Sequence, residues 1–138
     1  MNEFSLRILE VDGEFYNGQC VSIVVPTTEG SYGIQANHVN LFSALKTGTI
    51  KYTLPDGKVC YAAVSGGMIK VEDNEVLILA DSVESPDEID VKRATQEQID
   101  AQSILNEAGD YRSKITAEAM MQRAINRLKI KKRYGEYK

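Results

Sequence analysis

The sequence changes from a strand-like to a helical pattern within one acidic segment, residues 81–94, and this change determines the domain organisation. Before it, apolar and polar residues alternate in short runs, which is typical of β-strands. After it, apolar residues recur every three or four positions, as in amphipathic helices. Pro86 ends the strand-like region. Asp90 is placed to cap a helix, because its carboxylate can accept the free amide hydrogens of a first turn. We therefore predict two domains, residues 1–85 and residues 86–138.

The first domain is predicted to be all β. The expected strands cover residues 4–10, 20–25, 49–53, 59–64, 68–71 and 75–80. Turns or loops are expected at residues 12–13, 16–19, 26–33 and 55–57, where Gly, Pro, Asn, Asp, Ser and Thr gather, and a bulge or sharp bend is expected at residues 65–67. Short strands joined by such turns, without a long helical pattern between them, predict a β-sandwich or barrel and not a parallel α/β sheet.

The second domain is predicted to be an antiparallel α-helical hairpin. The first helix should begin after Asp90 and end at Gly109, and the second should begin at Asp110 or Ser113 and end near Gly135. The connection is very short, which favours antiparallel packing. Ala and Met supply much of the apolar stripe, so packing contributes only a few kcal/mol, at roughly 25 cal/mol per Å² of buried apolar area. We expect a mobile hairpin that can detach.

The charge is divided unevenly along the 138 residues. Within a net charge of −4, residues 72–110 carry twelve acidic and two basic side chains, whereas residues 112–138 carry nine basic and two acidic ones. This division indicates an anionic ligand or partner for the C-terminal segment, or docking of the two segments on each other; alternatively, the charges only solvate helix faces. No apolar run is long enough to span a membrane, and no leader peptide is evident, so a soluble, unexported chain is expected.

The sequence contains no motif that predicts catalysis. There is no GxSxG, HExxH, CxxC or GxxxxGK[ST] pattern, and one histidine cannot form a histidine-based metal site. We therefore expect no catalytic residue, no metal and no enzyme activity. Cys20 and Cys60 are expected to be buried thiols. His38, with Asn37 and Asn40, is either a surface or capping histidine or part of an exposed contact loop.

Three arginines form the candidate ligand site. Arg93 lies one turn into the first helix, and Arg123 and Arg127 lie four residues apart on one face of the second. In an antiparallel hairpin the three guanidinium groups can converge, and such groups bind phosphate oxygens well. The N-terminus of the first helix adds partial positive charge. The alternative is that the arginines only pair with carboxylates of residues 84–88.

Four stretches together resemble the epsilon subunit of bacterial F-type ATP synthases. Residues 33–48 are similar to the family's Gly-Ile…His…Leu…Leu…Gly segment, and residues 64–81 to its last hairpin. Residues 89–94, Ile-Asp-Val-Lys-Arg-Ala, match the Ile/Leu-Asp-x-x-Arg-Ala motif of the ATP-binding, Firmicute-like members. Residues 122–128 resemble the basic face of their second helix. The resemblance covers nearly the whole chain.

The resemblance implies a rotor subunit of the central stalk that is peripheral to the cytoplasmic face of the cell membrane and reaches the membrane only through the complex. The head would bind the gamma subunit and the c-ring, with Asn37, His38 and Val39 in contact. The hairpin would lie folded, favoured by ATP, or extend into the alpha/beta catalytic head and inhibit hydrolysis. The implied ATP-binding residues are Glu84, Ile89, Asp90, Arg93, Arg123 and Arg127.

Two departures from the family pattern are evident. Residues 98–100, Gln-Ile-Asp, stand where some ATP-binding members have a further basic residue, and Asn40 stands where many have proline. The first removes a phosphate contact and adds negative charge. Two other functions remain open from the residues: a free-standing nucleotide-sensing module, and a nucleic-acid binder using the basic C-terminal segment. The latter is disfavoured, because no basic sheet face with interleaved aromatic residues accompanies that segment.

Overall fold

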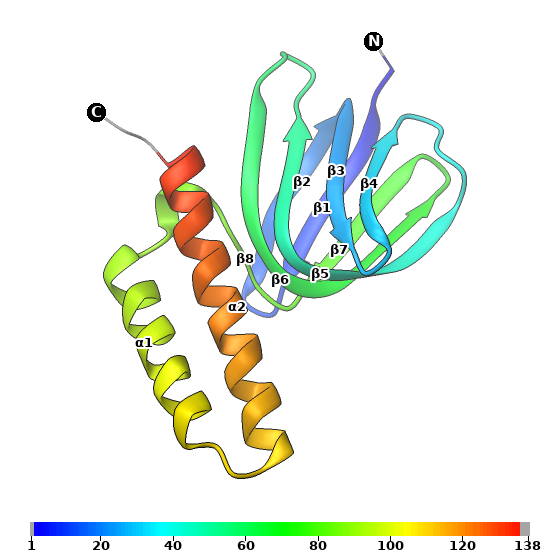
Figure 1. Cartoon of the computed structure of the whole chain (residues 1–138). Helices are drawn as coiled ribbons and strands as arrows, with labels where there is room; N and C mark the ends of the chain where they lie inside the picture. Colours follow the sequence, from blue (N-terminus) through cyan, green and yellow to red (C-terminus); the bar gives the residue numbers. More distant parts are fainter. Residues whose placement is uncertain (1, 136–138) are drawn as a thin grey trace. The chain divides into compact units, whose positions relative to one another are not determined.

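The computed structural model describes residues 2–135 and separates the chain into two compact units, one on each side of the Ser85–Pro86 bond. Each unit is described by itself. The first contains only β-strands, and the second contains a short 3₁₀ helix and two α-helices in contact (Figure 1). This architecture confirms the predicted fold class, a β-sandwich followed by a helical hairpin.

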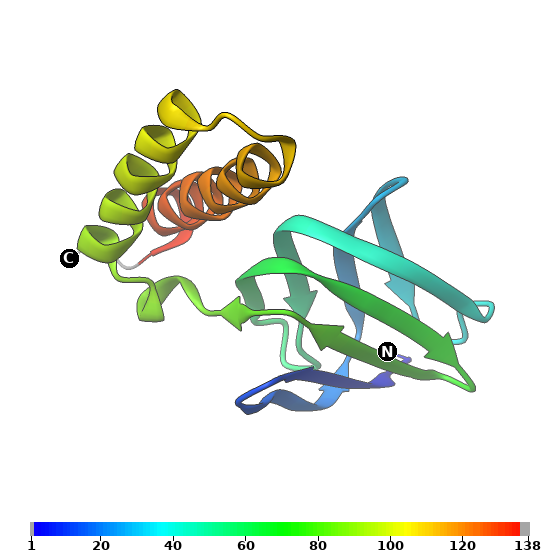
Figure 2. The same ribbon diagram turned by 90° about the horizontal axis from the view of Figure 1, so that it is seen from below.

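The first unit is built from one folded sheet of eight strands in the order β2-β1-β7-β6-β5-β3-β4, with β8 paired to β6. All pairs are antiparallel except β1 with β7. Figure 2 shows the sheet folding over on itself, so that its inner faces enclose the core. The strands are β1 (Phe4–Glu10), β2 (Gly13–Cys20), β3 (Ser22–Thr27), β4 (Gly30–Gln35), β5 (Leu41–Thr53), β6 (Val59–Glu72), β7 (Glu75–Ala80) and β8 (Val83–Glu84).

Alternating large apolar side chains from nearly all of these strands fill the sandwich core. In β1, for example, Phe4, Leu6 and Ile8 are at most 1% exposed, while the residues between them face outward. This is the period-two pattern that the sequence displays. Other fully buried side chains are Ile23, Val25, Ile34, Ile50, Val64, Ile69 and Ile78.

The predicted turn at residues 16–19 was wrong, because these residues lie inside β2. Gly18 pairs with Leu6 of β1, and the Tyr16 side chain arches over it. A Cβ at Gly18 would lie 2.9 Å from the Tyr16 hydroxyl oxygen, which itself donates a hydrogen bond to the carbonyl oxygen of Gln19. The glycine at this position therefore makes room for an aromatic ring and does not form a turn.

The predicted loop at residues 26–33 was also mostly wrong. Strand β3 runs to Thr27 and β4 begins at Gly30, so only two residues connect them. Buried Thr27 closes the hairpin: its Oγ1 donates to the Gly30 carbonyl oxygen at 2.6 Å and accepts the amide hydrogen of Glu29 at 3.2 Å. The polar residues of β4 are exposed, since β4 lies at the edge of the sheet.

The predicted break at residues 65–67 is a sharp bend within a continuous strand. Gly66 and Gly67 have φ values of 112° and 125°, where only glycine is unstrained. A Cβ at Gly67 would lie 2.1 Å from the carbonyl oxygen of Leu79, so the close approach of β7 also requires glycine. Beyond the bend, β6 changes partner from β8 to β7.

The second unit contains a 3₁₀ helix, η1 (Pro86–Glu88), and the helices α1 (Val91–Glu107) and α2 (Tyr111–Tyr134). Asp90 caps α1 through the Arg93 amide, and Asp110 caps α2 through the Ser113 amide, at 3.1 and 3.0 Å. Both predicted caps are confirmed. Helix α1 ends before Gly109, at an extended Ala108, so that Gly109 does not serve as a left-handed cap.

Small residues form the seam between α1 and α2, which run antiparallel (Figure 1). The buried residues of the two helices are Ala94 and Ala101 in α1, and Ala117, Ala124 and Ile130 in α2. The larger side chains of the predicted stripe are on average less buried; Ile99 is 56% exposed. Alanines seven residues apart on both helices allow close approach of the backbones, but each buries little apolar area.

Candidate functional site

One carboxylate joins the two helices of the hairpin. Glu97 Oε1 lies 3.2 Å from Arg93 Nε one turn earlier on α1, and Glu97 Oε2 lies 3.1 Å from Arg127 Nη1 on α2. The Arg127 side chain is 18% exposed and Arg93 is 75% exposed. The structure thus brings together two of the three predicted arginines around a single oxyanion.

Glu97 was not among the predicted site residues. The sequence does contain a signal for it, because Arg93 and Glu97 have the four-residue spacing at which oppositely charged side chains meet on a helix. Its second partner, Arg127, depends on how α1 and α2 are rotated against each other. That rotation is set by the alanine seam and is not evident from residue spacing on one helix.

Of the remaining predicted residues, only Ile89 and Asp90 lie at the start of α1. Asp90 accepts the Arg93 amide hydrogen as the helix cap, and Ile89 is 4% exposed. Arg123, partly buried, lies one turn before Arg127 on α2 and forms no ion pair among residues 2–135. Glu84 belongs to β8 in the first unit.

The basic C-terminal segment continues along α2. Lys131, Lys132 and Arg133 occupy its last turn, where positive charge is favoured by the helix dipole. Lys138 and Glu136, which were counted in the charge analysis, lie outside the described residues. The described part of α2 therefore carries the positive charge that the sequence predicts for an anionic ligand or partner.

The arrangement at Glu97 is chemically a site for oxyanions. A guanidinium group binds carboxylate and phosphate oxygens through the same N–H donors, so a position that holds a carboxylate between two arginines can also hold a phosphate. The capped start of α1 lies one turn from Arg93 and adds favourable potential for negative charge.

A loop at one end of the sandwich presents the three predicted contact residues. Asn37 has a φ of 62°, and its amide hydrogen is donated to Asn74 Oδ1 at 2.7 Å. His38 Nδ1 lies 2.7 Å from the carbonyl oxygen of Val39, and its ring packs edge-on against Tyr32. Val39 is 76% exposed. The loop is thus held by the hydrogen bond to Asn74, and it exposes the apolar side chain of Val39.

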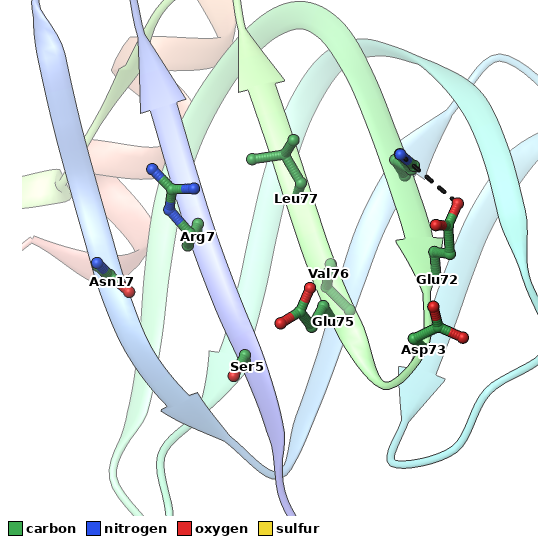
Figure 3. Close-up of a pocket in the computed structure, with 9 residues that line it drawn as sticks. Ser5, Arg7, Asn17, Glu72, Asp73, Glu75, Val76 and Leu77 are labelled. Carbon is green, nitrogen blue, oxygen red and sulfur yellow. Dashed lines mark ion pairs between the residues drawn. The ribbon is translucent and has the colours of Figure 1, made fainter.

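Figure 3 shows a separate shallow cavity of about 270 Å³ on the outside of the sandwich. Its basic side chains, Arg7 and Lys70, are balanced by carboxylates, and Lys70 pairs with Glu72 at 3.5 Å. This mixture of charges does not favour one class of ligand, and no predicted site residue lines the cavity. The lining residues are Ser5, Arg7, Asn17, Lys70, Glu72, Asp73, Glu75, Val76 and Leu77.

Of the two cysteines predicted to be buried, Cys20 is buried and Cys60 is only partly buried. Cys20 is fully buried, and burial raises the pKa of its thiol, which keeps it protonated and weakly nucleophilic. Both cysteines are free thiols. Among residues 2–135, no cluster of three or more His, Cys, Asp or Glu side chains could hold a metal ion. In the same range, no helix is long and apolar enough to cross a bilayer.

Two family models together match almost the whole chain. The model for the β-sandwich domain of the ATP synthase delta/epsilon chain matches residues 3–86, and the model for its long α-helix domain matches residues 87–132. The chain is 36% identical to the ATP synthase epsilon chain of Shouchella clausii, over 98% of this chain and 99% of that one. It is 37% identical to the ATP synthase epsilon chain of Staphylococcus aureus strain JH9, over 94% and 97%.

Two solved structures share the fold. One is the Euglena gracilis mitochondrial ATP synthase OSCP/F1/c-ring, in which a chain with 22% identity superposes with a TM-score of 0.75, covering 87% of this chain and 76% of that one. The other is the central stalk/c-ring of the Tetrahymena thermophila mitochondrial ATP synthase, with 16% identity, a TM-score of 0.63, and coverage of 94% and 97%.

Proposed function

This chain belongs to the family of bacterial ATP synthase epsilon chains, and from that premise we propose that it is a rotor subunit whose helical hairpin senses ATP. The family is that of a non-catalytic subunit of the central stalk. The sensing function, the ligand and the contacts within the rotor are our proposal. They are argued below from the described residues.

The rotor contacts are assigned to the sandwich. The two solved structures with this fold are an OSCP/F1/c-ring assembly and a central stalk/c-ring assembly. We assign the c-ring or gamma contact to Asn37, His38 and Val39. Support comes from the exposed Val39 and from Phe42, which is 66% exposed a few residues later. Val39 lies in the loop and Phe42 is the second residue of β5, and large apolar side chains exposed in this way favour a protein interface over solvent.

The ATP site is assigned to the hairpin. The observation that carries this proposal is the pairing of Arg93 and Arg127, from different helices, with a single carboxylate. A ligand phosphate that accepts hydrogen bonds from arginines of both helices would bind the paired hairpin better than separated helices. We assign phosphate contacts to Arg93, Arg123 and Arg127, and the remaining ATP contacts to Ile89, Asp90 and Glu84.

Linkage turns such a site into a switch. A ligand shifts the equilibrium toward the paired hairpin only by the ratio of its affinities for the paired and the separated helices. A tenfold shift requires a difference of about 1.4 kcal/mol in binding free energy. Charged hydrogen bonds contribute about 1.5–3 kcal/mol each, so one phosphate contact suffices. When ATP is scarce, the hairpin would extend, and the basic last turns of α2 would meet an acidic surface of the alpha/beta head and inhibit hydrolysis.

The test is a calorimetric titration of ATP into the full chain. Arg123→Ala and Arg127→Ala should each weaken ATP binding about tenfold or more, because each removes a charged donor to phosphate. Arg112→Ala is the matched control, since Arg112 is an exposed arginine at the opposite end of the hairpin. It should change the affinity by less than about twofold. An absence of binding heat for the unmodified chain at millimolar ATP would end the sensor proposal and leave the rotor role.

A further inference from the structure

We propose that Glu97 is a built-in competitor of the ligand phosphate, which sets the ATP concentration to which the hairpin responds. The inference rests on the proposed ATP site and adds a residue to it. It also gives that residue a role opposite to that of the arginines. Glu97 would join the two helices whenever the ligand-free hairpin is paired, and would be displaced when a nucleotide binds.

The geometry supports this competition. The two carboxylate oxygens of Glu97 are used separately, one for Arg93 at 3.2 Å and the other for Arg127 at 3.1 Å. The Arg93 Nε and Arg127 Nη1 donors that face Glu97 are thus occupied by its carboxylate. A phosphate that takes those donors must replace the carboxylate, because two anions cannot share them without repulsion.

Burial strengthens the competition on the α2 side. The Arg127 side chain is only 18% exposed and the Glu97 side chain 34% exposed, so their pair is screened by solvent less than a surface pair would be. The Arg93 side chain is 75% exposed, so its pair contributes less. The competition is therefore mainly for Arg127, the arginine that connects ligand binding on α1 to α2.

The neighbouring carboxylate, Asp100, does not have this role. It lies on the same face of α1, one turn beyond Glu97, but its Oδ1 accepts a hydrogen bond from Gln96 on its own helix at 2.8 Å. Asp100 departs from the pattern of ATP-binding family members, but Glu97 is the carboxylate that pairs with both arginines.

The direction of the effect does not depend on how often the hairpin opens without ligand. If the free hairpin is mostly paired, neutralising Glu97 removes a bond that ATP would have to break. If it is mostly open, the bond is absent from the starting state, and neutralisation still removes repulsion in the bound state. In both cases ATP binds more tightly once Glu97 is uncharged.

The experiment compares Glu97→Gln with the unmodified chain by calorimetric titration of ATP into the full chain at fixed ionic strength. Glutamine keeps the size of the side chain and one acceptor oxygen, but it removes the charge and puts an amide donor in place of the second acceptor. We expect the Kd for ATP to fall about 3- to 10-fold. Glu107→Gln is the matched control, because Glu107 is exposed at the far end of α1 and forms no ion pair among residues 2–135. It should change Kd by less than about twofold.

A second measurement without ATP tests the bridging role. Amide hydrogen exchange in α1 and α2 should be faster in Glu97→Gln than in the unmodified chain or in Glu107→Gln, because the variant loses the charge that joins the helices. Equal exchange rates in all three proteins would overturn the claim that Glu97 joins the two helices of the ligand-free hairpin.

The titration separates failure of this inference from failure of the proposed function. If the unmodified chain binds ATP and Glu97→Gln binds it no more tightly, the competitor role is wrong and the ATP site stands. If only Glu97→Gln binds, the competitor role is supported, and the unmodified chain is not a sensor. If neither binds up to millimolar ATP, the site itself is absent and the competitor role is excluded with it.

Discussion

Several residues that indicate turns in the sequence serve close packing in the structure. Gly18 lies under the Tyr16 ring, and Gly67 lies against the carbonyl oxygen of Leu79, where any side chain would collide. From sequence alone, a glycine between strand-like runs can indicate either a turn or a place where another group packs closely against the backbone. Whether such a glycine forms a turn or allows close packing depends on the atoms that pack against it. These atoms belong to a neighbouring strand or to another side chain, and their positions are known only from the folded structure.

Asn74 is a residue whose importance the sequence did not indicate. It occupies the tight turn between β6 and β7 with a φ of 60°. Its Nδ2 donates to the Glu3 carbonyl oxygen at 2.9 Å, and its Oδ1 accepts the amide hydrogen of Asn37 at 2.7 Å. One side chain thus connects the turn, the start of the first strand and the proposed contact loop.

Asn74→Ala should therefore lower the free energy of unfolding of the chain by about 1–3 kcal/mol, because two backbone groups lose a partner and alanine is strained at positive φ. Denaturant unfolding followed by circular dichroism measures the change. Asn74→Gly separates the causes, since it removes the hydrogen bonds without the strain. Asn17→Ala, an exposed asparagine on β2, is the control. A loss no greater than that of the control would contradict the anchoring role.

Among the elements, both helices and most of the interior strands could be predicted from the sequence, although β5 (Leu41–Thr53) was predicted only from residue 49, and the edge strands could not. Strand β1 buries every second residue, and the pattern was clear. Strands β2 and β4 lie at the two ends of the sheet order and bury only Cys20 and Ile34. An edge strand with two exposed faces needs no apolar alternation, so its residues resemble a loop. The starts of the helices were predicted correctly because Asp90 and Asp110 cap amides only three residues away, so the signal lies within the local sequence.

The cap of α2 predicts a pH dependence. Hydrogen bonds from the Ser113 side chain and backbone amide hold the pKa of Asp110 below its usual value. A carboxyl with a lowered folded-state pKa stabilises the fold above its unfolded pKa, and this contribution disappears as pH falls through the folded-state pKa. Asp110→Ala should therefore speed amide exchange in the first turn of α2 at neutral pH, and its difference from the unmodified chain should shrink in acid.

Asp110→Asn distinguishes capping from charge in this experiment. Asparagine caps helices about as well as aspartate but does not titrate in this range. It should protect the first turn of α2 at neutral and acid pH alike. A constant difference between the alanine variant and the unmodified chain at all pH values would show that the carboxylate charge does not contribute.

On the scale of the whole molecule, the two units are stabilised by different interactions. The sandwich buries large aliphatic and aromatic side chains, whereas the two helices bury four alanines and one isoleucine between residues 91 and 134. The helix pair therefore depends more on its charges, above all on Glu97 and its two arginines. Two helices that are held together by a small apolar seam and an exchangeable ion pair can separate while the sandwich stays folded, as the proposed switch requires.

In the proposed function the sandwich provides the permanent attachment to the rotor, and its exposed loop is the proposed contact. Val39→Asp places a charge on a side chain that is 76% exposed in the isolated chain, so folding should be unaffected. If the loop packs against a rotor partner, that charge is desolvated there and weakens assembly. Val11→Asp is the matched control, at the turn between β1 and β2 and 92% exposed. With ATP synthase depleted of this subunit, retention of the added chain should fall at least severalfold for Val39→Asp alone. Equal retention of both variants would place the rotor contact elsewhere on the sandwich.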